Sequence, residues 1–290
     1  YNSKLYWGIR NNARQPGDFR AARPSDTPLV RHEMLENGYR LTQYTENHDE
    51  VRLASRHFAP FVADRSARAY LGLALSAYSA LLPGHYLIHG GQELQEDASV
   101  FGRFAGDNGR TSIFDFVYQA QTRKWLYETP PAWMVEFRNW YRRLFHLKNS
   151  APFNVGHSYS QSTFVDLDPA NWYKEQSHYV GSYLRHHNGE SYLVVINSDP
   201  FSSHRATIHF TTNSNEDTLG ALWAMGVENN DSRYEFVEVF TREGWVPEDP
   251  ALPERGLPGW ALYRSGDVPS GLFLGDIPAG TTLIFKVNKL

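Results

Sequence analysis

Apolar residues in the first half of the chain recur with helical spacing in one long segment and form short runs on either side of it. The helical pattern covers 66–82 and ends at the Pro-Gly pair 83–84. The runs at 41–45 and 85–89 predict strands, the second of them buried. An order of strand, helix and strand is typical of parallel βα units.

The segments around this unit have other patterns. Residues 1–40 contain Asn-Asn, Pro-Gly and Arg-Pro-Ser clusters and predict irregular structure. Residues 92–128 are polar and contain glycine, so we expect a long loop, and loops of this length are often functional. Thr129 and the two prolines after it predict the N-cap and first turn of a helix that ends near Asn149. The side chains expected to face inward on this helix are Phe137, Trp140, Tyr141, Leu144 and Phe145.

From about residue 150 the apolar positions alternate with polar ones, as in strands. Residues 179–185 and 191–197 alternate around a His-Asn-Gly-Glu segment, and Asn-Gly is the strongest short hairpin signal. Turn clusters separate further strand candidates at 204–210, 236–240, 271–274 and 281–287. The pattern predicts an antiparallel β-sandwich or barrel.

The change of period predicts two domains, with a boundary near Ser150. Residues 1–150 form the α/β part and residues 151–290 the all-β part. The chain has 290 residues, of which 41% are hydrophobic and 14% aromatic, so we expect a sizeable core.

Charge and cysteine content exclude several classes of partner and site. The formal net charge is −4 and no run of lysine and arginine is present, so we expect neither a nucleic acid nor an anionic membrane as partner. The chain has no cysteine, which excludes disulfides and thiolate metal sites. No apolar run approaches the roughly 20 residues of a membrane span, and the sequence leaves the compartment open.

A dense polar cluster follows the first predicted strand. Glu46, Asn47, His48 and Asp49 come directly after it, and the Gln-Glu pair 92–93 follows the next strand in the same way. Functional groups of βα-barrels lie on the loops after the strands, and carboxylates there suit sugar cleavage, because its transition state resembles an oxocarbenium ion. Solvated loop charges and a helix cap are the alternative interpretation.

Four segments, in the same order along the chain, resemble the α-amylase family of glycoside hydrolases. The cluster 46–49 resembles its fourth signature region, and 83–93 resembles its eighth barrel strand with the Gly-x-Glu turn. Residues 106–115 resemble the loop that follows in bacterial members, and 151–290 resemble the C-terminal sandwich domain. The resemblance implies the C-terminal part of a (β/α)8 TIM barrel followed by an antiparallel β-sandwich.

The resemblance also implies roles for the cluster. Asp49 matches the carboxylate that stabilises the transition state, and His48 matches the imidazole that holds the same sugar. With them we group Asn47, Glu46 and Arg52 as substrate-binding residues. The implied substrates are α-1,4-glucans such as starch, glycogen and maltooligosaccharides. His89 departs from the family, which usually has tyrosine there, and the usual proline near Tyr86 is also replaced.

The family's retaining mechanism needs two further carboxylates, a nucleophile and a general acid about 5–5.5 Å apart. These come from earlier strands, and no segment upstream of Glu46 matches them. Glu33 and Glu36 lie in an amphipathic segment that we interpret as helical. The chain begins at Tyr1 without a methionine, which we interpret as an excised piece of a longer gene product. We therefore expect the isolated chain to be inactive and to need the remaining barrel strands.

Two alternatives to hydrolysis stay open. Glucan transfer uses the same glycosyl-enzyme intermediate, and nothing in the chain separates the two reactions. The sandwich could instead be a non-catalytic carbohydrate-binding module, which would bind glucan as residues 151–290 alone; Trp172, Tyr173 and Trp223 are candidates for its surface.

We expect no cofactor. A structural calcium ion at Asp166 and Asp168 is the alternative, but the segment lacks the ligand series of a calcium loop. His85 and His89 have i, i+4 spacing, but they lie in a predicted strand with no third ligand between them.

Overall fold

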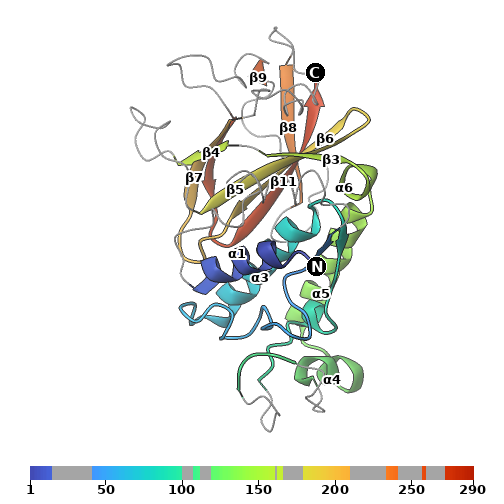
Figure 1. The fold of residues 1–290 in the computed structure, drawn as a ribbon, viewed down its shortest axis with the longest axis vertical. Helices are drawn as coiled ribbons and strands as arrows, with labels where there is room; N and C mark the ends of the chain where they lie inside the picture. Colours follow the sequence, from blue (N-terminus) through green and yellow to red (C-terminus); the bar gives the residue numbers. More distant parts are fainter. Residues whose placement is uncertain are drawn as a thin grey trace.

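A computed structural model shows a helical part and a sheet part, which lie one below the other in Figure 1. The helices of the first half occupy the lower region, and the antiparallel strands of the second half lie above them. The residues that the structure describes are 1–14, 41–99, 107–111, 119–160, 162–165, 179–209, 233–240, 257–258 and 272–290. Within these ranges no helix has both the length and the apolar character needed to cross a bilayer.

The predicted βα unit is present. Strands β1 (Thr42–Gln43) and β2 (His85–Tyr86) pair in parallel, and α3 (Arg65–Ala80) connects them. The Asp64 side chain accepts a hydrogen bond from the Ala67 amide at 2.7 Å and so caps α3. Both strands are shorter than the predicted runs, because they pair with each other at only two positions.

The prediction of irregular structure for 1–40 is wrong at its beginning, where α1 (Ser3–Arg14) forms. Leu5, Ile9 and Ala13 recur every four residues and are buried against the core. The Asn2 side chain caps the helix by accepting from the Leu5 amide at 3.1 Å. Burial of this stripe outweighs the low helix propensity of the glycine and asparagines in the segment.

The predicted long loop contains two short helices, η4 (Gln92–Leu94) and α4 (Ala120–Tyr127). The helix predicted after it is confirmed as α5 (Ala132–Lys148), and α6 (Ala151–Asn154) follows. Of the five residues of α5 predicted to face inward, four are buried and Phe145 is half-buried. Thr129 is not the N-cap; Pro131 takes this position, because the chain stays extended through both prolines.

The second half forms two antiparallel sheets, as its alternation predicted. The larger sheet has the strand order β3 (His157–Ser160), β5 (Val180–His187), β6 (Glu190–Asn197), β11 (Thr281–Lys289), β8 (Arg233–Phe240), β9 (Leu257–Pro258). The smaller sheet has the order β10 (Leu272–Ile277), β7 (His204–His209), β4 (Ser162–Val165).

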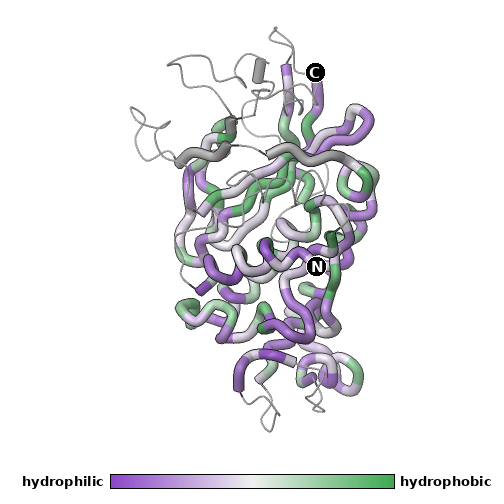
Figure 2. The backbone as a smooth tube through the Cα atoms, viewed as in Figure 1, coloured by the Kyte–Doolittle hydropathy of each residue, from purple (hydrophilic) through white to green (hydrophobic). Residues whose placement is uncertain are grey.

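The Asn-Gly hairpin is confirmed between β5 and β6. Asn188 and Gly189 both have positive φ, 47° and 84°, as the tight turn between twisted strands requires. A core of apolar side chains combines residues of both sheets, and Figure 2 shows hydrophobic positions along the central strands. Its members include Val180, Leu184, Leu193, Val195, Ala206, Ile208, Leu272 and Ile277.

A second, larger core joins α3 to the six-stranded sheet. Tyr78 of α3 packs against Tyr183 of β5, with ring centroids 5.1 Å apart. The Tyr183 hydroxyl donates to the Tyr78 carbonyl at 2.6 Å, and the Thr282 hydroxyl donates to the Ala74 carbonyl at 2.8 Å. The boundary near Ser150 stays a prediction, and the two parts share this core.

Candidate functional site

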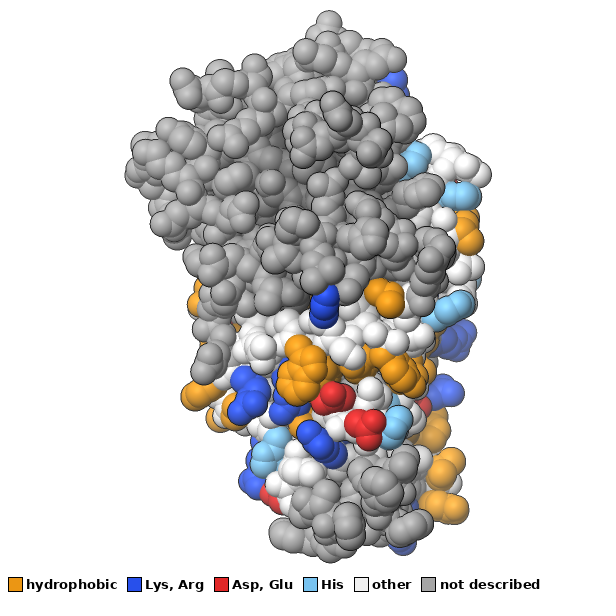
Figure 3. All heavy atoms as spheres, in the orientation of Figure 1, with side chains coloured by type: hydrophobic (Ala, Val, Ile, Leu, Met, Phe, Trp, Pro, Cys, Tyr) orange, Lys and Arg blue, Asp and Glu red, His pale blue; other side chains and the backbone are white. Residues whose placement is uncertain are grey.

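The ends of β1 and β2 place two turns at the same edge of the helical part. Because the strands are parallel, the cluster after β1 and the Gly-Gly turn after β2 leave the pair in the same direction. Arg52 connects them, since its Nη2 donates to the Gly90 carbonyl at 2.5 Å. Figure 3 shows charged and histidine side chains gathered over the helical part on one face.

The turn after β1 is fixed by an asparagine. The Asn47 side-chain oxygen accepts from the Asp49 amide at 2.8 Å, and the Glu50 amide donates to the Asn47 carbonyl at 3.3 Å. His48 Nε2 lies 3.1 Å from an Asp49 carboxylate oxygen, and their side chains are 40% and 72% exposed. The turn therefore presents an imidazole–carboxylate pair to solvent.

Glu46 and Arg52 lie beneath this turn as a buried ion pair. Arg52 Nη1 is 2.7 Å from Glu46 Oε1, and the Leu53 amide donates to Glu46 Oε2 at 2.5 Å. Burial raises the pKa of Glu46 to about 7, and the Arg52 charge opposes this rise. Both side chains are inaccessible, so they can position the turn but offer no surface to a ligand.

A buried amide below the ion pair ties four elements together, and we call it the Gln92 network. Gln92 Nε2 lies within 3.0–3.2 Å of four hydroxyl oxygens, and these hydroxyls also bond each other in pairs. The hydroxyls belong to Thr45, Ser76, Tyr86 and Tyr141. The network fixes both strand ends against α3 and α5.

His89 lies beside the site at the end of the β2 segment. Its Nε2 is 3.2 Å from the Thr111 hydroxyl. Burial lowers the pKa of His89 to about 4, and the charges of Arg52 and His48 act in the same direction. His89 is thus a neutral hydrogen-bonding group near pH 7, next to the exposed pair.

Solved structures resemble the whole chain. A maltogenic α-amylase from Thermotoga neapolitana has 15% identity and a TM-score of 0.53, and the match covers 99% of this chain and 50% of that one. An α-amylase from H. orenii has 15% identity and a TM-score of 0.51, covering 99% and 48%. A trehalose-6-phosphate hydrolase from Bacillus licheniformis has 15% identity and a TM-score of 0.50, covering 99% and 51%.

The chain has the fold of part of an α-amylase-type enzyme. It spans about half the length of the solved structures it matches. No family model matches the sequence, and no curated protein matches it. The resemblance inferred from the sequence motifs is therefore confirmed at the level of fold.

Within this α-amylase-type fold, part of the predicted loop 106–115 can be placed. Residues 107–111 are described, and Val51 forms an antiparallel bridge with Arg110, while the Arg52 amide donates to the Gly109 carbonyl at 2.8 Å. The loop thus pairs with the residues that follow the exposed pair in the chain.

Several predicted features lie outside the described residues. They are Glu33 and Glu36, the calcium alternative at Asp166 and Asp168, and the surface aromatics Trp172, Tyr173 and Trp223. In the part of the chain that the structure describes, no three histidine, aspartate or glutamate side chains group as a metal site. The expectation that no cofactor is needed stays a prediction.

Proposed function

We propose that the chain forms part of the active site of an α-amylase-type glycoside hydrolase that acts on α-1,4-glucans. His48 and Asp49 would contact the sugar at the bond to be cleaved. The observation that carries the proposal is the exposed imidazole–carboxylate pair on a fixed turn, at the edge where parallel strands end. Active sites of βα-barrels form at this edge.

The proposed chemistry assigns charge stabilisation to Asp49. Cleavage of a glycosidic bond builds positive charge on the sugar ring, and a fixed carboxylate nearby lowers the energy of that state. Asp49 can accept hydrogen bonds from sugar hydroxyls, and His48, whose Nε2–H faces Asp49, can accept one at Nδ1. Such groups must hold their positions within about 0.5 Å to be effective.

Glu46, Asn47 and Arg52 would act through the position of this pair. Asn47 fixes the backbone of Asp49 through its 2.8 Å hydrogen bond, and the buried Glu46–Arg52 pair links the turn to the Gly90 carbonyl. Their place in the motif predicts that they bind substrate. Their burial supports a positioning role for Glu46 and Arg52.

We expect the nucleophile and the general acid to come from earlier barrel strands outside this chain. A retaining mechanism needs them about 5–5.5 Å apart on opposite faces of the bond. We therefore expect the pure 290-residue chain to bind glucan without cleaving it. Release of reducing sugar from starch by the pure chain would contradict this part of the proposal.

The test is the affinity of the full chain for maltoheptaose, measured by isothermal titration calorimetry. Asp49→Asn removes the charge but keeps the shape, and we expect roughly tenfold weaker binding, because hydrogen bonds to charged groups contribute about 1.5–3 kcal/mol. Asp107→Asn is the matched control, since Asp107 is an exposed carboxylate paired with Arg56 and His57. Equal affinity in Asp49→Asn and the unsubstituted chain would refute the site.

The same titration separates the alternatives. A carbohydrate-binding module on the sheets would bind glucan with no dependence on Asp49. Transfer and hydrolysis share the glycosyl-enzyme intermediate, so only the products of a catalytically complete enzyme distinguish them: transfer would give chains longer than the substrate.

A further inference from the structure

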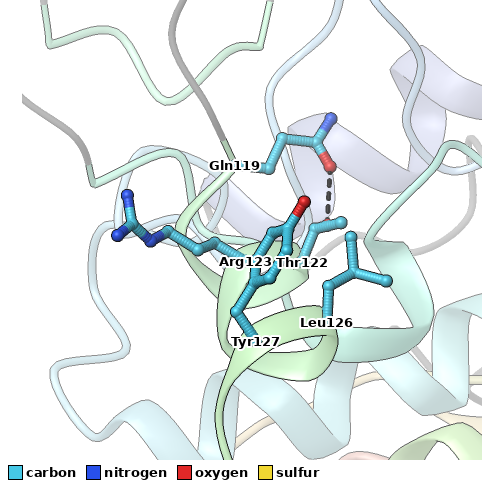
Figure 4. Close-up of a pocket in the computed structure, with 5 residues that line it drawn as sticks. All are labelled: Gln119, Thr122, Arg123, Leu126 and Tyr127. Carbon is cyan, nitrogen blue, oxygen red and sulfur yellow. Dashed lines mark hydrogen bonds between the residues drawn. The ribbon is translucent and has the colours of Figure 1, made fainter.

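A hollow of about 480 Å³ lies along one face of α4. The residues that line it are Gln119, Thr122, Arg123, Leu126 and Tyr127. Their spacing of three and four places them on one side of the helix. Figure 4 shows four of these side chains grouped together and Arg123 extending away from them. We call this face the α4 groove.

The α4 groove adjoins the Gly-Gly turn and the buried Arg52 of the candidate site. Gly91 follows the carbonyl that Arg52 binds, and it has a φ of +87°. A Cβ atom on Gly91 would lie 2.7 Å from Gln119 Oε1, 2.9 Å from Arg52 Nη2 and 3.0 Å from the Thr122 hydroxyl. One turn of backbone therefore touches both the buried ion pair and the first residues of the groove.

The first turn of α4 is fixed by a buried carboxylate. Glu96 Oε2 accepts from the Gln121 amide at 2.9 Å, and Glu96 Oε1 accepts from the Ala98 amide at 3.2 Å. A carboxylate at this end also suits the helix dipole. The groove is thus held at a set position relative to the Gly-Gly turn.

The lining of the α4 groove combines an exposed apolar end with hydrogen-bonding groups. Tyr127 is 80% exposed and Leu126 62% exposed. Gln119 and Thr122, whose side chains are 2.9 Å apart, and the Arg123 guanidinium supply polar groups. A glucose ring has an apolar face and a rim of hydroxyls, and aromatic residues with polar neighbours suit such ligands.

The size of the α4 groove favours a small ligand over a protein. Its volume lies within the range of about 300–1,000 Å³ found for ligand pockets. Among the described residues its lining consists of four residues of α4 and the N-cap Gln119, far fewer than the roughly 20–30 residues a side of a standard protein interface.

We propose that the α4 groove binds glucose units of an α-glucan chain whose cleavage point lies at His48 and Asp49. This inference rests on the proposed function, because the glucan must extend from that site across the Gly-Gly turn. Tyr127 provides the stacking surface, and the polar groups of Gln119 and Arg123 bind sugar hydroxyls. Only glucans long enough to reach from His48 and Asp49 to the α4 groove bind more tightly because of the groove.

The test compares maltose and maltoheptaose as ligands of the full chain by calorimetric titration. We expect Tyr127→Ala to weaken maltoheptaose binding three- to tenfold and to leave maltose affinity within twofold. Tyr127→Trp keeps a stacking surface and should bind maltoheptaose like the unsubstituted chain. Phe201→Ala is the control, because Phe201 is 59% exposed on the connection between β6 and β7, outside the groove.

The outcomes separate this inference from the function on which it rests. If maltoheptaose binding depends on Asp49 but Tyr127→Ala changes neither ligand, or both equally, the groove is not a binding site while the proposed function stands. If the unsubstituted chain binds neither sugar, both proposals fail. Tyr127→Ala should keep the thermal unfolding temperature of the parent, since its side chain lies largely in solvent.

Discussion

The two parts of the chain hold their strands together in different ways. β5 and β6 pair over eight residues through a continuous backbone ladder, from Val180↔Asn197 to His187↔Glu190. β1 and β2 pair over two residues, and the side chains of Gln92 and Arg52 make further links between the segments that follow them. The stability of the sheets therefore comes from backbone pairing, apolar faces and turns. The geometry of the site instead comes from a few buried polar residues.

The largest effect is expected from breaking the buried ion pair of the site. Arg52→Met should lower the free energy of unfolding by about 3–5 kcal/mol, because it leaves the Glu46 carboxylate buried without its partner. Urea unfolding followed by circular dichroism measures the change. The double variant Glu46→Leu/Arg52→Met removes both charges and should recover a large part of the loss. A loss below about 1 kcal/mol in the single variant would mean that Glu46 takes up a proton or is reached by solvent, so that no unpaired charge stays buried.

A matched pair of glycines compares the two parts directly. Gly91 and Gly189 have nearly equal φ values, +87° and +84°, but only Gly91 has neighbours where a Cβ would be. Gly189→Ala should cost about 1–2 kcal/mol for the backbone alone. Gly91→Ala should cost about 1 kcal/mol more, because Arg52 cannot move away without loosening its bonds to Glu46 and Gly90. Equal losses of unfolding free energy in the two variants would show that the neighbours of Gly91 move aside at no extra cost.

The smallest expected effect is a pH dependence from His89. Its pKa is about 4 in the folded chain against an ordinary value of 6.5. Between these values the unfolded chain binds a proton that the folded chain does not, so stability falls as the pH drops from 6.5 to 4. Because His89 is partly exposed, we expect only roughly 1–2 kcal/mol over this range.

His89→Gln isolates this contribution. The difference in unfolding free energy between the two proteins, measured at several pH values, should grow in favour of the variant as the pH falls from 6.5 to 4. A difference that stays constant with pH would mean that His89 keeps its ordinary pKa.

Much of the fold could be predicted where one signal dominates a segment. The apolar stripe of α3, the inward face of α5 and the Asn-Gly hairpin each predicted their elements. The sequence does not predict helix α1, because its three apolar positions Leu5, Ile9 and Ala13 lie among polar residues. Only their burial against the rest of the chain stabilises the helix. The sequence places the cap of α5 at Thr129 instead of Pro131, because threonine is a stronger capping signal than the prolines that follow.

The site could be predicted only at its surface. The motif at 46–49 indicated a polar turn at a strand end, and the structure places it there. The Gln92 network carried no such signal, because its hydroxyls lie 6 to 49 positions away in the chain. The burial of Glu46 and Arg52 likewise depends on distant segments, so two residues grouped as ligands by their place in a motif lie beneath the surface.

The hydroxyls of Tyr183 and Thr282 bond to backbone carbonyls in the second half of α3. The six-stranded sheet is bonded to α3 of the helical part. If α3 unfolded, the face of the sheet that packs on α3 would be exposed. Heating should therefore give a single calorimetric peak for both parts, with equal calorimetric and van't Hoff enthalpies. By the same reasoning, transferring the sheets into another protein would require the matching surface of α3 to go with them.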